Sequence, residues 1–162
     1  MVIADTSIVF DESEGGCVSV YRGPEPGTPY VIGGDTAGGG SAYFVGQVID
    51  NITGEQVCVL RHGFDEDQYA RQLYCLGKYY GDALIAVEVN FSSYPVRELE
   101  KLGYVNQYVR RQEDSFTRRM TERFGFKTTA VTRPLLIAGL AAVARENPEL
   151  LHHRETLGEM LT

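Results

Sequence analysis

The sequence predicts an α/β domain in which helices flank a mixed β-sheet. Short alternating or apolar stretches, separated by turn residues, occupy residues 17–60 and are typical of strands joined by hairpins. Beyond residue 65, stretches with helical spacing alternate with strand-like ones, which indicates crossover connections. Apolar residues make up 43% of the 162 positions, which is enough to form the core of one domain.

Four strands are expected in the first part of the chain. A loop rich in proline and glycine, residues 22–27, follows the first of them, so residues 1–27 are interpreted as an extension of the domain. The turn at residues 50–54 joins the last two strands as a hairpin. The expected strands are Cys17–Tyr21, a strand from Tyr30 toward Asp35, Ala42–Ile49 and Gln56–Leu60.

Helices and two further strands are expected after residue 64. Asp65 is a suitable N-cap because Gln68 follows three residues later, as in a capping box, and Gly81 suits the end of this helix. The continuous apolar run Ala83–Val87 predicts a central strand that is buried on both faces. The other expected elements are a helix at Tyr94–Leu102, a strand at Val105–Val109, a helix from Thr132 to about Glu146 and a helical tail at Leu150–Thr162.

Charge and cysteine content limit the class of function. The net charge of −7 is unusual for a protein that binds nucleic acid, but residues 108–127 hold six basic residues against three acidic ones. Taken alone, this basic segment is equally well interpreted as an exposed loop or hairpin with solvated charge. There is no signal peptide and no apolar run long enough to span a membrane, so a cytoplasmic protein is expected. The three cysteines are expected to be reduced thiols.

Two carboxylates stand out because each follows an apolar strand. Asp35 comes soon after Tyr30–Ile32, and Glu88 directly follows Ala83–Val87. In the expected topology these two strands are parallel neighbours, so the two carboxylates should lie side by side at one edge of the sheet. Two close carboxylates repel each other, and a shared Mg²⁺ or Mn²⁺ removes this penalty and activates water for phosphodiester cleavage. The alternative is that Asp35 is a turn residue and Glu88 pairs with a basic side chain.

The glycine-rich segment around Asp35 permits a second interpretation. Backbone N–H groups of Gly33–Gly40 could cradle a phosphate, as in actin-like nucleotide-binding proteins. The segment lacks the lysine of a P-loop, and a strand follows it instead of the helix of a dinucleotide-binding motif. Asn90 is expected to orient a ligand or to cap a turn, and His152 and His153 are expected to be an exposed pair.

Four stretches, taken in order, resemble the C-terminal nuclease domain of the terminase large subunit of tailed phages and prophages. They are Tyr30–Ala37, Phe64–Ala70, Val87–Asn90, and Gly125–Thr129 together with Thr132–Pro134. The resemblance extends from about residue 16 to the C-terminus. It implies a ribonuclease H-like fold, which also fits the expected order of strands and helices.

This resemblance implies a metal-dependent endonuclease that cuts concatemeric DNA during packaging. Its Mg²⁺ or Mn²⁺ ions are held by three acidic residues, and Asp35 and Glu88 correspond by position to the first two. The third is expected beyond Thr162 and the ATPase domain is expected to be absent, so the nuclease activity of this chain is expected to be low or nil. A non-catalytic remnant that binds DNA or packaging partners is the alternative.

The resemblance also implies partners. Double-stranded DNA is the expected substrate, and the terminase small subunit and the portal are the expected protein partners in the cytoplasm of the host cell. Removing the basic residues of segment 108–127 is expected to weaken DNA binding and flatten its salt dependence. The candidate contacts to the DNA backbone are Arg110, Arg111, Arg118, Arg119 and Lys127.

Overall fold

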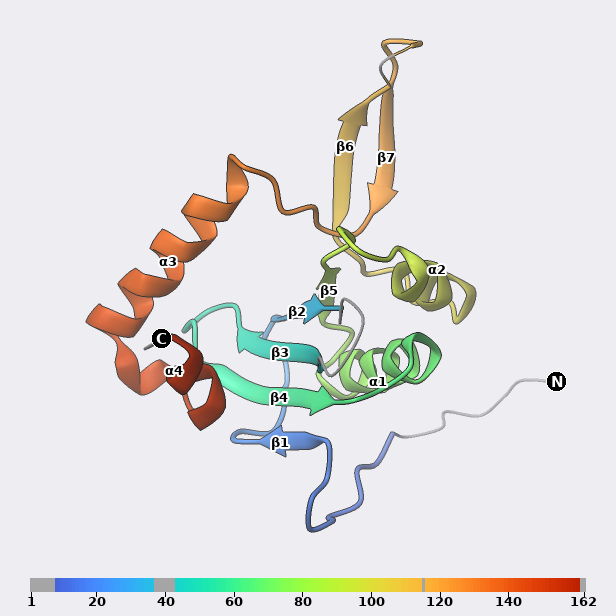
Figure 1. Ribbon diagram of the computed structural model, residues 1–162. Coiled ribbons are helices and arrows are strands. Elements are labelled where there is room, and N and C mark those ends of the chain that lie inside the picture. Colours follow the sequence, from blue (N-terminus) through green and yellow to red (C-terminus); the bar gives the residue numbers. More distant parts are fainter. Residues whose placement is uncertain (1–7, 37–42, 115, 161–162) are drawn as a thin grey trace, which may run out of the picture.

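A five-stranded mixed β-sheet lies at the centre of the protein in the computed structural model, which describes residues 8–36, 43–114 and 116–160 (Figure 1). The strands are β1 Val18–Val20, β2 Tyr30–Asp35, β3 Phe44–Asp50, β4 Gln56–His62 and β5 Leu84–Val87. Their order is β1–β4–β3–β2–β5, with every pair antiparallel except β2 and β5, which are parallel. The predicted mixed sheet is therefore confirmed. The prediction that Ala83–Val87 is a central strand buried on both faces is wrong, because β5 is the last strand of the sheet and alternate residues of it are only partly buried. Ala42, where the third strand was expected to begin, lies outside the described residues.

The helices α1 (Glu66–Tyr79) and α2 (Tyr94–Lys101) share the main hydrophobic core with the sheet. The predicted N-cap is confirmed, because Oδ1 of Asp65 accepts a hydrogen bond of 2.8 Å from the backbone N–H of Gln68. The apolar residues of α1 at helical spacing are completely buried, together with inward-facing residues of β2, β3 and β5. The core side chains with no exposed surface include Ile32, Val48, Tyr69, Leu73, Leu76 and Val87.

The C-terminal segment packs against the sheet through the buried side chain of Gln56. Its Oε1 atom accepts hydrogen bonds from the backbone N–H groups of His152 at 2.8 Å and His153 at 2.7 Å. This contact places the helix α4 (Arg154–Met160), which follows the short 3₁₀ helix at Pro148–Leu150, beside the sheet. The prediction that both histidines are exposed is wrong for His153, because only 8% of its surface is accessible. The predicted helical tail, from Leu150 to Thr162, is confirmed only for Arg154–Met160, because residues 151–153 are not helical; 161 and 162 lie outside the described residues.

The expected strand at Val105–Val109 does not form as predicted. Within that range, only Gln107 makes a bridge to Ile85 of β5, and the chain then leaves the sheet. Residues 109–124 instead form a separate hairpin of β6 (Val109–Glu113) and β7 (Met120–Phe124), which projects away from the sheet in Figure 1. Residues 109–113 pair with residues 120–124, the next strand along the chain, and not with β5.

The helix α3 (Thr132–Glu146) has the predicted bounds but no buried residue, contrary to the expectation that the helices pack on the sheet. In Figure 1 a loop leads from the base of the hairpin to α3, which runs toward α4 to one side of the sheet. Its apolar residues include Leu135, Leu136 and Ile137, which are consecutive and so point in different directions. No single face could bury them all. Among the described residues, no helix is long and apolar enough to cross a membrane.

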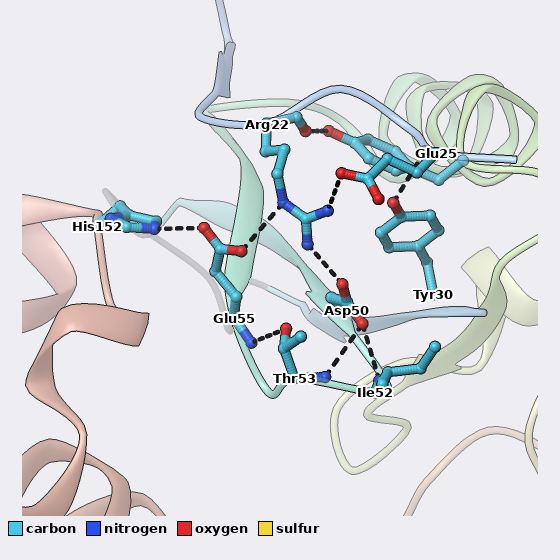
Figure 2. A network of polar contacts seen from close by, with 9 residues as sticks. Arg22, Glu25, Tyr30, Asp50, Ile52, Thr53, Glu55 and His152 are labelled. Carbon is cyan, nitrogen blue, oxygen red and sulfur yellow. Dashed lines mark hydrogen bonds and ion pairs between the residues drawn. The ribbon is translucent and has the colours of Figure 1, made fainter. Parts of the chain in front are cut away.

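A network of ion pairs attaches the N-terminal segment to the far end of the sheet (Figure 2). The guanidinium of Arg22 donates to Asp50 at 2.5 Å, to Glu25 at 2.7 Å and to Glu55 at 3.0 Å. Glu55 also contacts His152 at 3.0 Å, so the network connects the segment after β1, the β3–β4 turn and the C-terminal segment. Residues 18–27, interpreted from sequence as part of an extension, are therefore bound into the sheet by β1 and by Arg22.

Candidate metal centre and nucleic-acid interface

Asp35 and Glu88 lie side by side, as the sequence predicts. β2 and β5 are parallel and in register, with Gly34 opposite Val87. The pairing continues past the strand ends, because the backbone N–H of Glu88 donates a hydrogen bond of 2.7 Å to the carbonyl oxygen of Gly34. Residues at equivalent positions of neighbouring strands point to the same face. The two carboxylates therefore share one face at the end of the two strands.

The electrostatics of Asp35 indicate that the carboxyl group of Glu88 is in close contact. The pKa of Asp35 is raised above its ordinary value, mainly by desolvation, and further by a hydrogen bond with Glu88 and by repulsion from its charge. A hydrogen bond from the backbone N–H of Thr36 opposes this rise. No ion pair of the described residues involves Glu88, so the alternative that it pairs with a basic side chain is wrong.

This pair of carboxylates suits a hard divalent cation, since oxygen donors with negative charge are the ligands that such ions prefer. A cation between the two groups would remove the repulsion that raises the pKa of Asp35. Within the part of the chain that the structure describes, no group of three or more histidine, cysteine, aspartate or glutamate side chains is arranged to hold a metal. The candidate centre therefore consists of two carboxylates.

Gly34 positions Asp35 because any larger residue would collide with its surroundings. A Cβ atom at Gly34 would lie 2.6 Å from the hydroxyl oxygen of Tyr69 and 3.2 Å from Cγ2 of Val87. The Tyr69 hydroxyl is itself fixed, because it donates a hydrogen bond of 2.6 Å to the carbonyl oxygen of Val45. The close approach of α1 to the end of β2 thus depends on the missing side chain.

We expect Gly34→Ala to destabilise the protein by about 1–3 kcal/mol, the usual cost of overpacking a rigid site. Gly33→Ala is the matched control, because a Cβ atom at that neighbouring position meets nothing within 4 Å. Urea unfolding of both variants measures the difference. Equal stability of the two variants would show that the contact between Gly34 and Tyr69 is not rigid.

A second segment supports Glu88 on the side away from β2. Phe126 forms a parallel bridge with Glu88. Its backbone N–H donates a hydrogen bond of 2.8 Å to the carbonyl oxygen of Val87, and its carbonyl oxygen accepts one of 2.9 Å from the backbone N–H of Val89. The side chain of Asn90 then holds the next residues, donating to the carbonyl of Thr128 at 2.7 Å and accepting from its N–H at 2.9 Å. Asn90 is therefore a structural clamp, which agrees with the turn-capping interpretation.

The return of the chain from the hairpin to Glu88 depends on Gly125. This residue has a φ of +93°, and a Cβ atom there would collide with the side chain of Val89. Because Lys127 follows Phe126 directly, the base of the hairpin and one of the predicted DNA contacts lie beside the candidate metal centre.

Sequence reasoning missed Arg61 as a member of the site. Arg61 of β4 and Asp35 of β2 are both in register with Val45 of β3, so the three side chains share one face. Asp35 and Arg61 line a cleft of about 310 Å³ together with His153, Glu155 and other residues of the C-terminal segment. The guanidinium of Arg61 stacks on the ring of Tyr43, 3.9 Å from its centre. Only the strand register reveals this placement.

The predicted DNA-binding residues lie mostly on the hairpin. Arg111 pairs with Glu122 at 3.0 Å and Arg118 pairs with Glu113 at 3.4 Å, and all four side chains are exposed. Exposed pairs of this kind contribute little to stability. The interpretation as a hairpin with solvated charge is correct for these two pairs but not for Arg110, whose Nε and Nη1 atoms are buried, and a role in DNA binding stays a prediction. The glycine-rich segment expected as a phosphate cradle extends into residues 37–42, which lie outside the described residues.

Comparison with known proteins shows the fold. No family model and no curated protein matches the chain. The crystal structure of the large terminase nuclease from thermophilic phage G20c matches with a TM-score of 0.59 and 22% identity, over 84% of this chain and 64% of that one. The chain has the large terminase nuclease fold.

Related structures agree with this result. The nuclease domain of the large terminase of Thermus phage P74-26 matches with a TM-score of 0.57 and 23% identity, over 79% of this chain and 58% of that one. Structures of the G20c nuclease with bound magnesium, zinc and cobalt match at 21% identity. The chain spans between 58% and 70% of the length of these terminase nucleases. The predicted ribonuclease H-like sheet is confirmed, and the comparisons give no support to an actin-like nucleotide-binding fold.

Proposed function

We propose that this chain is a metal-dependent DNA endonuclease domain of a phage packaging terminase, which hydrolyses phosphodiester bonds of concatemeric double-stranded DNA. The observation that carries the proposal is the pair of carboxylates of Asp35 and Glu88 on parallel neighbouring strands. The terminase nuclease fold supports it. So does the magnesium, zinc or cobalt bound to the G20c nuclease in related structures.

Each residue of the site has a proposed task. Asp35 and Glu88 would hold Mg²⁺ or Mn²⁺, which supplies an activated water and stabilises the departing oxygen when bound. Arg61, which has no hydrogen-bonded or ion-paired side-chain partner among the described residues, would contact the scissile phosphate from β4. Lys127 and the four arginines of the hairpin would contact the DNA backbone outside the centre.

A plasmid-nicking experiment tests this function. Supercoiled plasmid is incubated with the protein and Mn²⁺ or Mg²⁺, and the conversion to open circles is followed by gel electrophoresis. We expect slow conversion with either ion, since the described residues provide two carboxylates and no third, and none with EDTA, because the two carboxylates without a cation cannot activate water. Calorimetric titration with Mn²⁺ measures the binding of the ion separately from cutting. Cutting that persists in EDTA would contradict the metal-dependent mechanism.

A non-catalytic packaging module is the second candidate. It is favoured by the two-carboxylate centre, since the described residues provide no third acidic ligand. This candidate predicts DNA binding that is the same in EDTA and in Mn²⁺, survives Glu88→Gln and leads to no cutting. For either candidate, the terminase small subunit and the portal are the proposed protein partners, in the cytoplasm of the host cell.

A further inference from the structure

A cleft lies away from Asp35, between α2 and the base of the β6–β7 hairpin. Its volume is about 680 Å³. Three arginines line it: Arg97 from α2, Arg110 from β6 and Arg123 from β7. We call this feature the arginine cleft. Arg97 lies outside the basic segment 108–127 that the sequence indicated for DNA binding, and Arg123 belongs to that segment but was not one of the five named contacts.

The hairpin register places two like charges directly opposite each other in this cleft. Arg110 is the cross-strand partner of Arg123, whereas the next pair, Arg111 and Glu122, has opposite charges and forms an ion pair of 3.0 Å. Consecutive residues of a strand point to opposite faces. One face of the hairpin is therefore neutralised, and the other carries a like-charged pair, which is unfavourable unless an anion lies nearby.

The guanidinium of Arg110 is short of acceptors. Its Nε and Nη1 atoms are buried and have no hydrogen-bond partner among the residues that the structure describes. Buried charged donors without acceptors are costly, so this arrangement is expected at a position where an external anion completes the bonds. No ion pair of the described residues involves Arg97, Arg110 or Arg123.

Two acidic residues, Glu100 and Glu122, also line the cleft, but neither forms an ion pair with one of its three arginines. Glu122 bonds to Arg111, and Glu100 forms no ion pair with any described residue. The cleft therefore holds three guanidinium groups and one carboxylate that is not paired, which leaves it net positive. Planar guanidinium groups bond well to the oxygens of a phosphate, which they can contact in pairs.

We propose that the arginine cleft binds a phosphate of the DNA backbone and holds the DNA strand beside the candidate metal centre. This inference rests on the proposed function and adds a specific anchoring site to it. The hairpin base connects the two places directly: Phe124 lines the cleft, and Phe126, two residues later, bridges to Glu88. Two residues span at most about 7 Å, so one bound strand can contact both.

DNA binding by a double variant tests the proposal. The probe is a fluorescent DNA duplex, followed by anisotropy in EDTA across a range of salt concentrations, so that binding is measured without cutting. We expect Arg110→Gln with Arg123→Gln to reduce the slope of log affinity against log salt by about 1 per arginine. This corresponds to roughly a tenfold loss of affinity per arginine at about 0.1 M salt.

A matched control removes the same charge elsewhere. Arg71→Gln with Arg145→Gln changes two exposed arginines on α1 and α3, and we expect it to bind the duplex nearly as the wild type does. Thermal unfolding without DNA provides a second readout. Because Arg110 has buried donors without acceptors, the cleft variant should unfold at the same temperature as the wild type or higher.

Three results would overturn the proposal. The first is a cleft variant that binds with unchanged affinity and salt slope, and the second is a loss no larger than that of the control. The third is displacement of the duplex by a polyglutamate peptide to the same extent from the wild type and from the cleft variant. The arginines of the cleft would then make no difference to the competition, so the cleft would not be the site of the duplex. A failure of the nuclease proposal is distinguishable, because it leaves this binding intact and abolishes only cutting in Mn²⁺.

Discussion

Asp35→Asn should abolish metal-dependent DNA cleavage and, at the same time, leave the metal-free protein at least as stable as the wild type. The carboxyl group of Asp35 is desolvated and lies against that of Glu88, which raises its pKa. The neutral amide has nearly the same shape and removes the repulsion. Cleavage should fall by more than about 100-fold, since even residues that only support a metal ligand account for 10- to 100-fold.

Two measurements separate this outcome from simple misfolding. Plasmid nicking in Mn²⁺ gives the loss of activity, and thermal unfolding in EDTA and in Mn²⁺ gives the stability. Mn²⁺ should stabilise the wild type but not Asp35→Asn, because a ligand stabilises only the state that binds it. Asp67→Asn, an exposed carboxylate on α1, is the control and should change neither property. An Asp35→Asn protein that cuts at the wild-type rate would refute the role of this residue.

Glu88→Gln should behave in the same way, because the two carboxylates face each other across one strand pair. The double variant Asp35→Asn/Glu88→Gln should be no less active than either single variant, since each alone already disrupts the centre. Strong non-additivity of this kind is typical of residues that act as one unit. Additive losses would indicate that the two carboxylates act at separate sites.

Arg22→Met should destabilise the fold by about 3–5 kcal/mol, the usual cost of leaving a buried charge without its partner. The side chain of Asp50 is only 4% exposed, and Arg22 donates to it at 2.5 Å. Adding Asp50→Asn to Arg22→Met should recover part of the loss, because no uncompensated charge is then buried. Urea unfolding of the two variants measures both effects.

Glu25→Gln is the control for the same guanidinium. Glu25 pairs with Arg22 at 2.7 Å but is 59% exposed, and exposed pairs contribute less than about 1 kcal/mol. If Arg22→Met costs no more than Glu25→Gln, then the network in Figure 2 contributes little to stability and the sheet alone holds the N-terminal segment.

The same network makes stability depend on pH. Burial alone would raise the pKa of Asp50, but the hydrogen bonds from Arg22 and from the N–H groups of Ile52 and Thr53 outweigh it and lower the pKa. Asp50 therefore contributes stability that is complete above its unfolded pKa, near 4, and that is lost as the pH falls through the lower folded value. Urea unfolding is measured for Asp50→Asn and the wild type between about pH 2 and pH 7. The free energy of unfolding of the variant should fall less steeply toward acid pH than that of the wild type.

Local patterns predicted most of the elements correctly. The apolar start of the strand at Tyr30–Ile32, the N-cap at Asp65 and the apolar run Ala83–Val87 each involve only a few neighbouring residues, so the sequence alone indicates the strands and the helix. The pairing of Asp35 with Glu88 also followed from sequence, because the expected order of strands makes β2 and β5 parallel neighbours. These features needed only periodicity and simple rules of topology.

How some segments pair and pack could not be predicted from the sequence. In place of the strand expected at Val105–Val109, the chain makes a single bridge to β5 and then forms a hairpin, and α3 has the predicted bounds without packing on the sheet. Ion pairs such as Arg22–Asp50 join residues 28 positions apart, and no local pattern indicates them. Such contacts are selected by packing energies that act only once the chain has collapsed.

The sequence by itself determined the class of sheet, the first helix and its cap, and the two carboxylates of the candidate centre. Only the tertiary structure decided that Arg61 faces the same cleft as Asp35, and that Arg110 and Arg123 face each other across a hairpin. The physical reason is register: shifting one strand by one residue sends every side chain to the opposite face, and long-range packing fixes that register.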